Sequence, residues 1–288
     1  MQPQISSAQL TVVFNHAGAE ICSITDKKGL EYIWQAGKEI WPRHAPLLFP
    51  IVGRLKDNSF LYKGRSYELM QHGFARDQEF NQIEKNDTSC CFELRSSIRT
   101  KEHFPFDFIL RVTYHLENDK LTSSYKVINP AQEFLFFSLG AHPGFNCPLV
   151  NGEHFEDYYL EFDRDEIFYT ELENGLRTDV RKKLKLENKK LGLKSSLFDQ
   201  DALVFEDGQI GSLSLCSGAS SHKVHLECSN WPYFGVWTKK GTEQFICLEP
   251  WFGVADDTNT TGQLTQKDGI LKLKPEGEFD CSFTITIG

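Results

Sequence analysis

Two residues of this sequence stand where a proton could be transferred. His142 follows the apolar run 137–141 and precedes Pro143, and such a pattern predicts a buried strand with a sharp exit. An imidazole at a strand end can point into a cleft, although a structural histidine is the commoner explanation of such a residue taken alone. Glu249 ends the apolar run 245–248, beside Trp251 and Phe252. Apolar surroundings raise the pKa of a carboxyl group, so Glu249 is a candidate general base, and the aromatic rings suit a sugar-stacking wall. A glutamate at the solvent boundary is the alternative.

Three further residues could bind a polar ligand. Arg54 follows Gly53 at the end of an apolar segment, where its planar group could donate to a sugar hydroxyl or a phosphate. His72 and Arg76 flank Gly73, which permits a tight loop that presents both side chains to one cavity. A salt bridge or a solvated loop explains each residue alone. Together, the two arginines make an anionic or polyhydroxy ligand worth considering.

Other chemistries lack their sequence patterns. The chain has no GxGxxG, phosphate-loop or GxSxG motif, and neither its remaining histidines nor its cysteines have regular metal-ligand spacing. We therefore expect no metal site and no cofactor.

Composition limits the class of protein and its partners. The 288 residues carry a net charge of -9, which argues against a general binder of the nucleic-acid backbone. No apolar run is long enough to cross a membrane, and the N-terminus does not resemble a secretory signal. Several of the eight cysteines lie in alternating apolar runs, where a reduced cysteine acts as a small hydrophobe. A cytoplasmic protein with no membrane or nucleic-acid partner is expected.

Apolar residues alternate with polar ones along much of the chain, as in 279–287 and 224–228. This period of two is typical of antiparallel strands with one face on a core. Turn residues predict hairpins at 111–127 and around Lys63-Gly64. Residues 171–196 are the exception, and we expect a short surface helix or a long loop there. We predict an all-β protein with a single domain over 1–288.

Five segments in order, 46–55, 71–76, 140–145, 197–203 and 248–251, resemble the aldose 1-epimerase (galactose mutarotase-like) family. The likeness is closest to its bacterial branch associated with lactose and galactose use. It implies a large antiparallel β-sandwich of the galactose mutarotase type, with the site in a concave cleft of one sheet. Residues 231–237 also resemble a family strand near that cleft.

The resemblance implies a role for each candidate residue. His142 looks like the general acid and Glu249 like the general base of an isomerase that interconverts the α and β anomers of a hexose. Arg54 and His72 look like substrate-binding residues, and Asp201 resembles the acidic residue that holds sugar hydroxyls. No metal or cofactor is required.

Two departures from the family pattern leave the substrate open. Gly53 stands where an asparagine commonly precedes the arginine, and Gly144 replaces a tyrosine. The segment ending at Arg76 also resembles that of hexose-6-phosphate mutarotases, in which arginines receive the phosphate. The alternatives are therefore a sugar phosphate, a non-catalytic sugar-binding protein, or a glycosidase that uses Asp201 and Glu249. A monomer and a homodimer both remain open.

Overall fold

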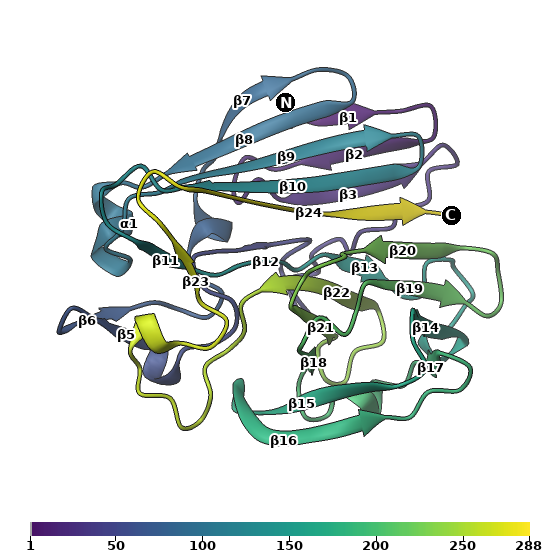
Figure 1. The fold of residues 1–288 in the computed structure, drawn as a ribbon. Helices are drawn as coiled ribbons and strands as arrows, with labels where there is room; N and C mark the ends of the chain where they lie inside the picture. Colours follow the sequence, from purple (N-terminus) through teal and green to yellow (C-terminus); the bar gives the residue numbers. More distant parts are fainter. Residues whose placement is uncertain (1) are drawn as a thin grey trace.

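The computed structural model describes residues 2–288, and antiparallel strands make up most of its regular structure. The first large sheet has nine strands in the order β17 (Lys190–Gly192), β14 (Tyr158–Phe162), β19 (Ser212–Ser217), β20 (Lys223–Glu227), β24 (Glu278–Ile287), β10 (Lys120–Ile128), β9 (Ile109–Glu117), β8 (Ser89–Arg95) and β7 (Asn81–Lys85). Figure 1 shows β8, β9, β10 and β24 running across the upper part of the molecule.

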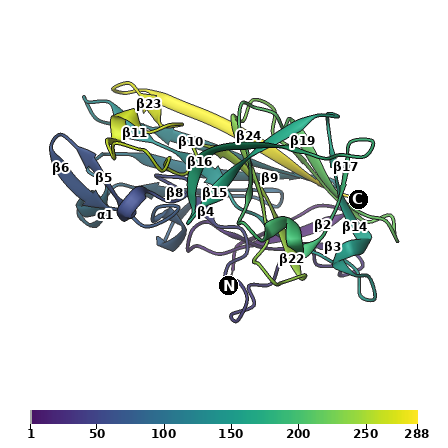
Figure 2. The same ribbon diagram turned by 90° about the horizontal axis from the view of Figure 1, so that it is seen from below.

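The second large sheet has eight strands. Its order is β16 (Leu176–Leu184), β15 (Ile167–Glu173), β18 (Leu203–Phe205), β21 (Tyr233–Trp237), β22 (Phe245–Phe252), β12 (Leu139–Ala141) and β4 (Leu47–Leu48), with β13 (Gly144–Asn146) also paired to β22. Its strands β15, β16, β18 and β21 lie in the lower part of Figure 1, and Figure 2 shows both sheets from below.

Smaller elements complete the fold. They are a three-stranded sheet of β1 (Gln4–Ser6), β2 (Leu10–Phe14) and β3 (Ile21–Asp26), the pairs β5 (Ser59–Tyr62) with β6 (Arg65–Glu68) and β11 (Leu135–Phe137) with β23 (Leu271–Leu273), and helix α1 (Ile98–His103). Short 3-10 turns lie at Lys56–Asn58, Ala75–Asp77, Phe155–Asp157, Ser195–Phe198 and Leu264–Gln266. Over residues 2–288, no helix is long and apolar enough to cross a membrane.

The two large sheets share one core. Leu215 and Ile285 from the nine-stranded sheet, and Val236 and Leu248 from the eight-stranded sheet, are fully buried in the same apolar cluster. The predicted all-β sandwich is confirmed. The cluster runs from Ile5 to the C-terminal strand, as a single domain over 1–288 would require, and that domain assignment stays a prediction.

Turn residues identified two hairpins correctly. Glu117 pairs with Lys120 across the turn between β9 and β10, and Tyr62 pairs with Arg65 across the turn at Lys63-Gly64. Lys63 adopts a positive φ of 48°, as such tight turns require.

The expectation of a helix or a long loop over 171–196 is wrong. Glu173 pairs with Leu176, so β15 and β16 form a hairpin whose two-residue turn is Asn174-Gly175, both at positive φ. An Asn-Gly pair is a strong hairpin signal because both residues tolerate this conformation. The charged residues on the exposed face of β16 obscured the strand periodicity.

Candidate active site

His142 and Glu249 face each other across two paired strands. β12 and β13 both pair with β22 and share one register, in which Gly144 lies opposite Cys247. The same register places His142 opposite Glu249, and His142 Nε2 lies 3.2 Å from Glu249 Oε2. β12 ends at Ala141, so His142 lies just past a strand end, as expected. Pro143 lacks an N–H and separates this strand from β13, where pairing with β22 resumes.

Strand alternation sorts β22 into a core face and a site face. Ile246 and Leu248 belong to the main core cluster, whereas Cys247, Glu249 and Trp251 point to the opposite side of the sheet. All five side chains are buried. The carboxyl group of Glu249 therefore lies between a thiol and an indole ring.

The indole of Trp251 is fixed by two glycines on the flanking strands. A Cβ atom at Gly140 would lie 2.7 Å from this ring, and one at Gly235 would lie 2.4 Å from it. The ring forms part of the site wall, and its buried Nε1 has no hydrogen-bond partner. The expectation that Phe252 lies with Trp251 beside Glu249 is wrong, because successive residues of a strand face opposite sides of the sheet. The Phe252 ring packs on that of Trp231, with the ring centroids 4.7 Å apart.

Trp41 covers His142 from a segment without regular structure. Its ring stacks on the imidazole at 5.0 Å and 29°, while Trp237 approaches the same imidazole edge-on at 5.7 Å. A Cβ atom at Gly144 would lie 2.7 Å from the Trp41 ring and 3.1 Å from the carbonyl of His44. The glycine that departs from the family pattern thus leaves room for Trp41. Sequence reasoning missed Trp41, since nothing periodic surrounds it.

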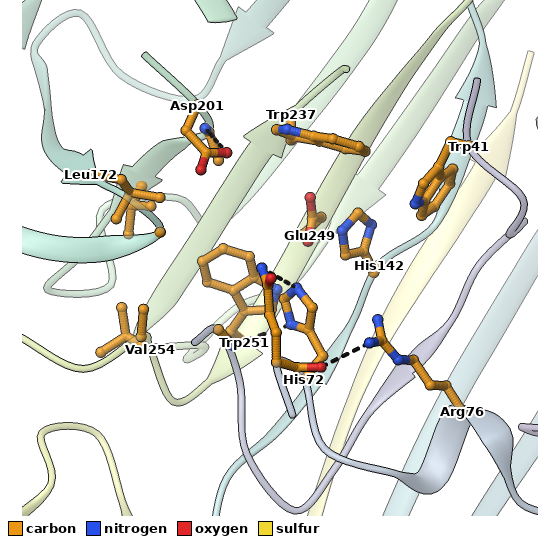
Figure 3. A pocket seen from close by; sticks show the side chains of 16 residues that line it. Trp41, His72, Arg76, His142, Leu172, Asp201, Trp237, Glu249, Trp251 and Val254 are labelled. Carbon is orange, nitrogen blue, oxygen red and sulfur yellow. Dashed lines mark hydrogen bonds and ion pairs between the residues drawn. The ribbon is translucent and has the colours of Figure 1, made fainter. Parts of the chain in front are cut away.

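A cavity of about 350 Å³ opens over this face of the sheet (Figure 3). Its lining consists of Trp41, Gly53, Gln71, His72, Arg76, His142, Leu172, Gly175, Asp201, Ala202, Val204, Trp237, Glu249, Trp251, Val254 and Ala255. Five of the six predicted site residues meet here although they come from distant parts of the sequence. This volume falls in the range of small-molecule sites.

Arg54 is the candidate residue that the structure does not bring to the cavity lining. Its Nη1 donates to the carbonyl oxygen of Asn174 at 2.9 Å, and its stem lies beside Gly175. The preceding residue, Gly53, lines the cavity instead and has a φ of 73°. The guanidinium of Arg54 thus supports the β15–β16 turn at the edge of the cavity, and its predicted contact with substrate stays a prediction.

His72 is held as a neutral donor. Its Nδ1 accepts a hydrogen bond from the backbone N–H of Gly53 at 3.2 Å, which leaves the ring proton on Nε2, where the side-chain amide of Gln71 lies 3.3 Å away. Burial, followed by repulsion from His142 and Arg76, lowers the pKa of His72 well below its ordinary value. Its backbone has a positive φ of 67°, a conformation that non-glycine residues seldom adopt outside constrained sites.

Asp201 lies at the rim of the cavity, with an exposed side chain. It has a positive φ of 89°, and its Oδ1 accepts a hydrogen bond from the N–H of Ala202 at 2.8 Å. Partial desolvation raises the pKa of Asp201. Its second carboxylate oxygen has no partner among residues 2–288 and can accept from a ligand hydroxyl.

Two arginines share one carboxylate beside the cavity. Arg43 Nη2 lies 2.9 Å from Asp77 Oδ1, and Arg76 Nε lies 3.8 Å from Asp77 Oδ2. Arg76 also donates to the carbonyl of Gln71 at 2.8 Å, but its buried Nε makes no hydrogen bond. Burial and the neighbouring Arg43 lower the pKa of Arg76 to about 10, so it stays charged at neutral pH. This corner of the site therefore carries excess positive charge, and sequence reasoning missed Arg43.

Burial pushes both members of the central pair towards their uncharged forms. It lowers the pKa of His142 to about 3, and the positive charges of Arg76 and Arg43 act in the same direction. Burial, followed by the charge of Asp201, raises the pKa of Glu249 well above its ordinary value. Both shifts favour the form of the pair in which Glu249 carries the proton and His142 is neutral. The rise at Glu249 agrees with the sequence prediction, whereas the fall at His142 was not foreseen.

These shifts predict a pH dependence of stability. The raised pKa of Glu249 contributes stability that is present below its unfolded pKa of about 4.3 and is lost as pH rises through the folded pKa. The lowered pKa of His142 has the opposite sign and acts only below pH ~6.5. Above pH ~6.5 the free energy of unfolding of the wild type should therefore fall relative to that of Glu249→Gln as pH rises, by at most about 1.4 kcal/mol per pH unit. Urea unfolding of both proteins at several pH values measures this difference. A constant difference would contradict the proton assignment.

Two buried cations hold the cavity wall opposite the pair. Lys267 Nζ donates to the carbonyl of Val254 at 2.6 Å and lies 3.0 Å from Asp256 Oδ1. Arg177 Nε donates to the carbonyl of Ala255 at 3.1 Å. Val254 and Ala255 line the cavity, so these cations fix the backbone of the wall from behind.

Known proteins resemble this chain over its full length. The family model described as aldose 1-epimerase matches residues 2–269. Protein LacX, chromosomal, of Lactococcus lactis subsp. lactis is 34% identical over 297 residues, covering 100% of this chain and 99% of that protein. A galactose mutarotase related enzyme from Lactobacillus acidophilus superposes with a TM-score of 0.96 at 36% identity, covering 100% of this chain and 97% of that one. A galactose mutarotase-like protein from Lactobacillus casei superposes with a TM-score of 0.94 at 27% identity, covering 100% of both chains. The chain belongs to the aldose 1-epimerase family and has LacX proteins among its bacterial relatives.

Proposed function

We propose that the protein is an aldose 1-epimerase that interconverts the α and β anomers of a hexose. The observation that carries this proposal is the pair His142 and Glu249, which are 3.2 Å apart in a cavity lined by hydrogen-bonding and aromatic side chains. Ring opening needs one group that takes a proton and one that gives a proton at the same pH. A pair that holds one proton meets this requirement.

In the proposed mechanism, Glu249 removes the proton of the anomeric hydroxyl while His142 protonates the ring oxygen. The ring opens to the aldehyde, rotation about C1–C2 exchanges its faces, and reclosure with the roles reversed gives the other anomer. The starting state needs the proton on His142, to which it passes from Glu249 across the 3.2 Å contact. Sugar hydroxyl groups that donate to the Glu249 carboxylate stabilise its charged form and favour this transfer.

Other side chains position the sugar. Neutral His72 offers its Nε2 proton to a ring or hydroxyl oxygen, and Asp201 accepts from a hydroxyl at the rim. Trp41 and Trp251 both line the cavity and offer apolar faces to the carbon atoms of a sugar. All eight cysteines are free, which suits the predicted cytoplasmic location.

The direct test follows anomer exchange by polarimetry or NMR with galactose, glucose and other aldoses. The enzyme should accelerate the exchange of at least one sugar well above the rate in buffer. Rates equal to buffer on every common aldose and sugar phosphate would contradict the proposal. Sugar binding without exchange would favour the non-catalytic alternative, and hydrolysis of an aryl glycoside would favour the glycosidase.

A sugar 6-phosphate is the second candidate substrate, and the excess positive charge at Arg76 and Arg43 favours it. Replacing Arg76 with methionine should raise KM for the phosphosugar by about 10- to 100-fold, because charge-assisted hydrogen bonds contribute roughly 1.5–3 kcal/mol. KM for the free sugar should change much less. Arg65→Met, at an exposed position of β6, is the control and should alter neither constant. An equal effect of Arg76→Met on both sugars would rule out phosphate recognition by this residue.

The packing of Trp41 over Gly144 gives a further prediction. In Gly144→Ala, the new methyl group would displace the Trp41 ring from His142, so kcat/KM should fall, and overpacking should lower the free energy of unfolding by about 1–3 kcal/mol. Trp41→Ala should lower kcat/KM in the same direction. Gly192→Ala is the matched control, because no atom lies within 4 Å of a Cβ at that position. Wild-type kinetics for Gly144→Ala would show that the Trp41 contact does not matter.

A further inference from the structure

A third potential metal ligand lies next to the proton-transfer pair. Cys247 stands two residues before Glu249 on β22 and points to the same side of the sheet. The Sγ atom of Cys247, a ring nitrogen of His142 and a carboxylate oxygen of Glu249 all lie within 4.8 Å of one another, and all three residues are buried. Residue spacing did not reveal this cluster, because His142 reaches it only through the pairing of β12 and β13 with β22.

The chemistry of this cluster suits a borderline-soft divalent cation. Imidazole, thiolate and carboxylate are all ligands of zinc, whereas magnesium and calcium prefer oxygen alone. The 3.2 Å between His142 Nε2 and Glu249 Oε2 is close to the roughly 3.3 Å expected between two ligands of a tetrahedral zinc ion. The thiol needs a shift on the order of 1 Å or less to complete a three-ligand arrangement.

Charge balance supports the same ion. A carboxylate and a thiolate neutralise a divalent cation, and a neutral assembly is the form that a buried position favours. Because the thiol and the carboxyl group bind a cation in their deprotonated forms, binding should tighten as pH rises.

We propose that a zinc ion binds to His142 Nε2, the Glu249 carboxylate and the Cys247 thiolate, and that it blocks anomer exchange. Inhibition follows because the ion takes the lone pair of the imidazole and the oxygen of the carboxylate that the reaction needs. The inhibitory role rests on the proposed function, whereas the existence of the zinc-binding site does not depend on it.

Cobalt(II) is the spectroscopic probe for the site. Titrated into the wild-type protein, it should produce a near-ultraviolet charge-transfer band from thiolate to cobalt. Cys247→Ala should lack this band, and Cys228→Ala, which removes another buried cysteine, should retain it. A wild-type spectrum without the band, or a band that survives in Cys247→Ala, would overturn the proposal.

Inhibition of anomer exchange by zinc is the kinetic test of the proposal. The zinc concentration that gives half-inhibition should be at least about 10-fold higher for Cys247→Ala than for the wild type. For the wild type this concentration should fall as pH rises, and magnesium should not inhibit. Equal zinc sensitivity of the wild type and Cys247→Ala would also overturn the proposal. If the wild type exchanges no sugar at all, the proposed function fails, but the cobalt spectra still decide whether the metal site exists.

Discussion

Replacing Glu249 with glutamine is expected to lower kcat for anomer exchange by about 10²- to 10⁴-fold, the usual contribution of a positioned acid or base. The amide keeps the shape of the side chain but cannot take up the proton of the anomeric hydroxyl. It also removes the one proton that the pair shares, so His142 has no source for the proton that it delivers. Binding of the sugar should change far less, because the cavity walls stay in place.

The measurement combines exchange rates by NMR with sugar affinity by titration on the same preparations. Glu93→Gln is the matched control, since Glu93 is another buried strand glutamate and lies on β8 of the nine-stranded sheet. This control loses the ion pairs with Arg95 and Arg111 and some stability with them, but it should keep kcat. If Glu249→Gln retained more than about a tenth of the wild-type kcat, general base catalysis by Glu249 would be excluded.

Local patterns predicted the strands and part of the site. Alternation along 279–287 identified β24, and the apolar run before Glu249 predicted a carboxyl group with a raised pKa, because both features depend only on neighbouring residues. Local patterns gave a wrong prediction around Asn174-Gly175, although this pair is a turn signal. The charged residues of the strand that follows obscured its alternation, so the hairpin of β15 and β16 was not predicted. The local pattern succeeded at His142, which directly follows the end of β12, although it did not foresee that pairing with β22 resumes beyond Pro143.

The remainder of the site depends on register between segments far apart in the sequence. That His142 lies opposite Glu249, with Cys247 beside them, follows from the pairing of β12 and β13 with β22. No spacing within one segment encodes this pairing. Trp41 was hidden for the same reason, because the space that it fills is created by the absence of a side chain at Gly144. Sequence reasoning therefore gave candidates for chemistry, and tertiary pairing supplied their geometry.

Lys267→Met is expected to lower the free energy of unfolding by about 3–5 kcal/mol, the cost of removing one partner of a buried ion pair. Lys267 and Asp256 are 6% and 4% exposed, and the ammonium group also donates to the carbonyl of Val254. Methionine fills a similar volume but leaves a buried carboxylate without its counter-charge. Urea unfolding measures the loss, and Lys120→Met on β10 should stay within about 0.5 kcal/mol of the wild type because its side chain is exposed.

The double variant Lys267→Met/Asp256→Asn separates the two possible origins of this loss. Asparagine carries no charge but can still accept the hydrogen bond that Asp256 Oδ2 receives from the N–H of Lys56. If the unpaired carboxylate causes the loss, the double variant should recover most of the stability. If the bond to the Val254 carbonyl is what matters, the double variant should be no more stable than Lys267→Met. In that case the cavity wall would owe its position to the ammonium group alone, and KM for the sugar should rise in both variants.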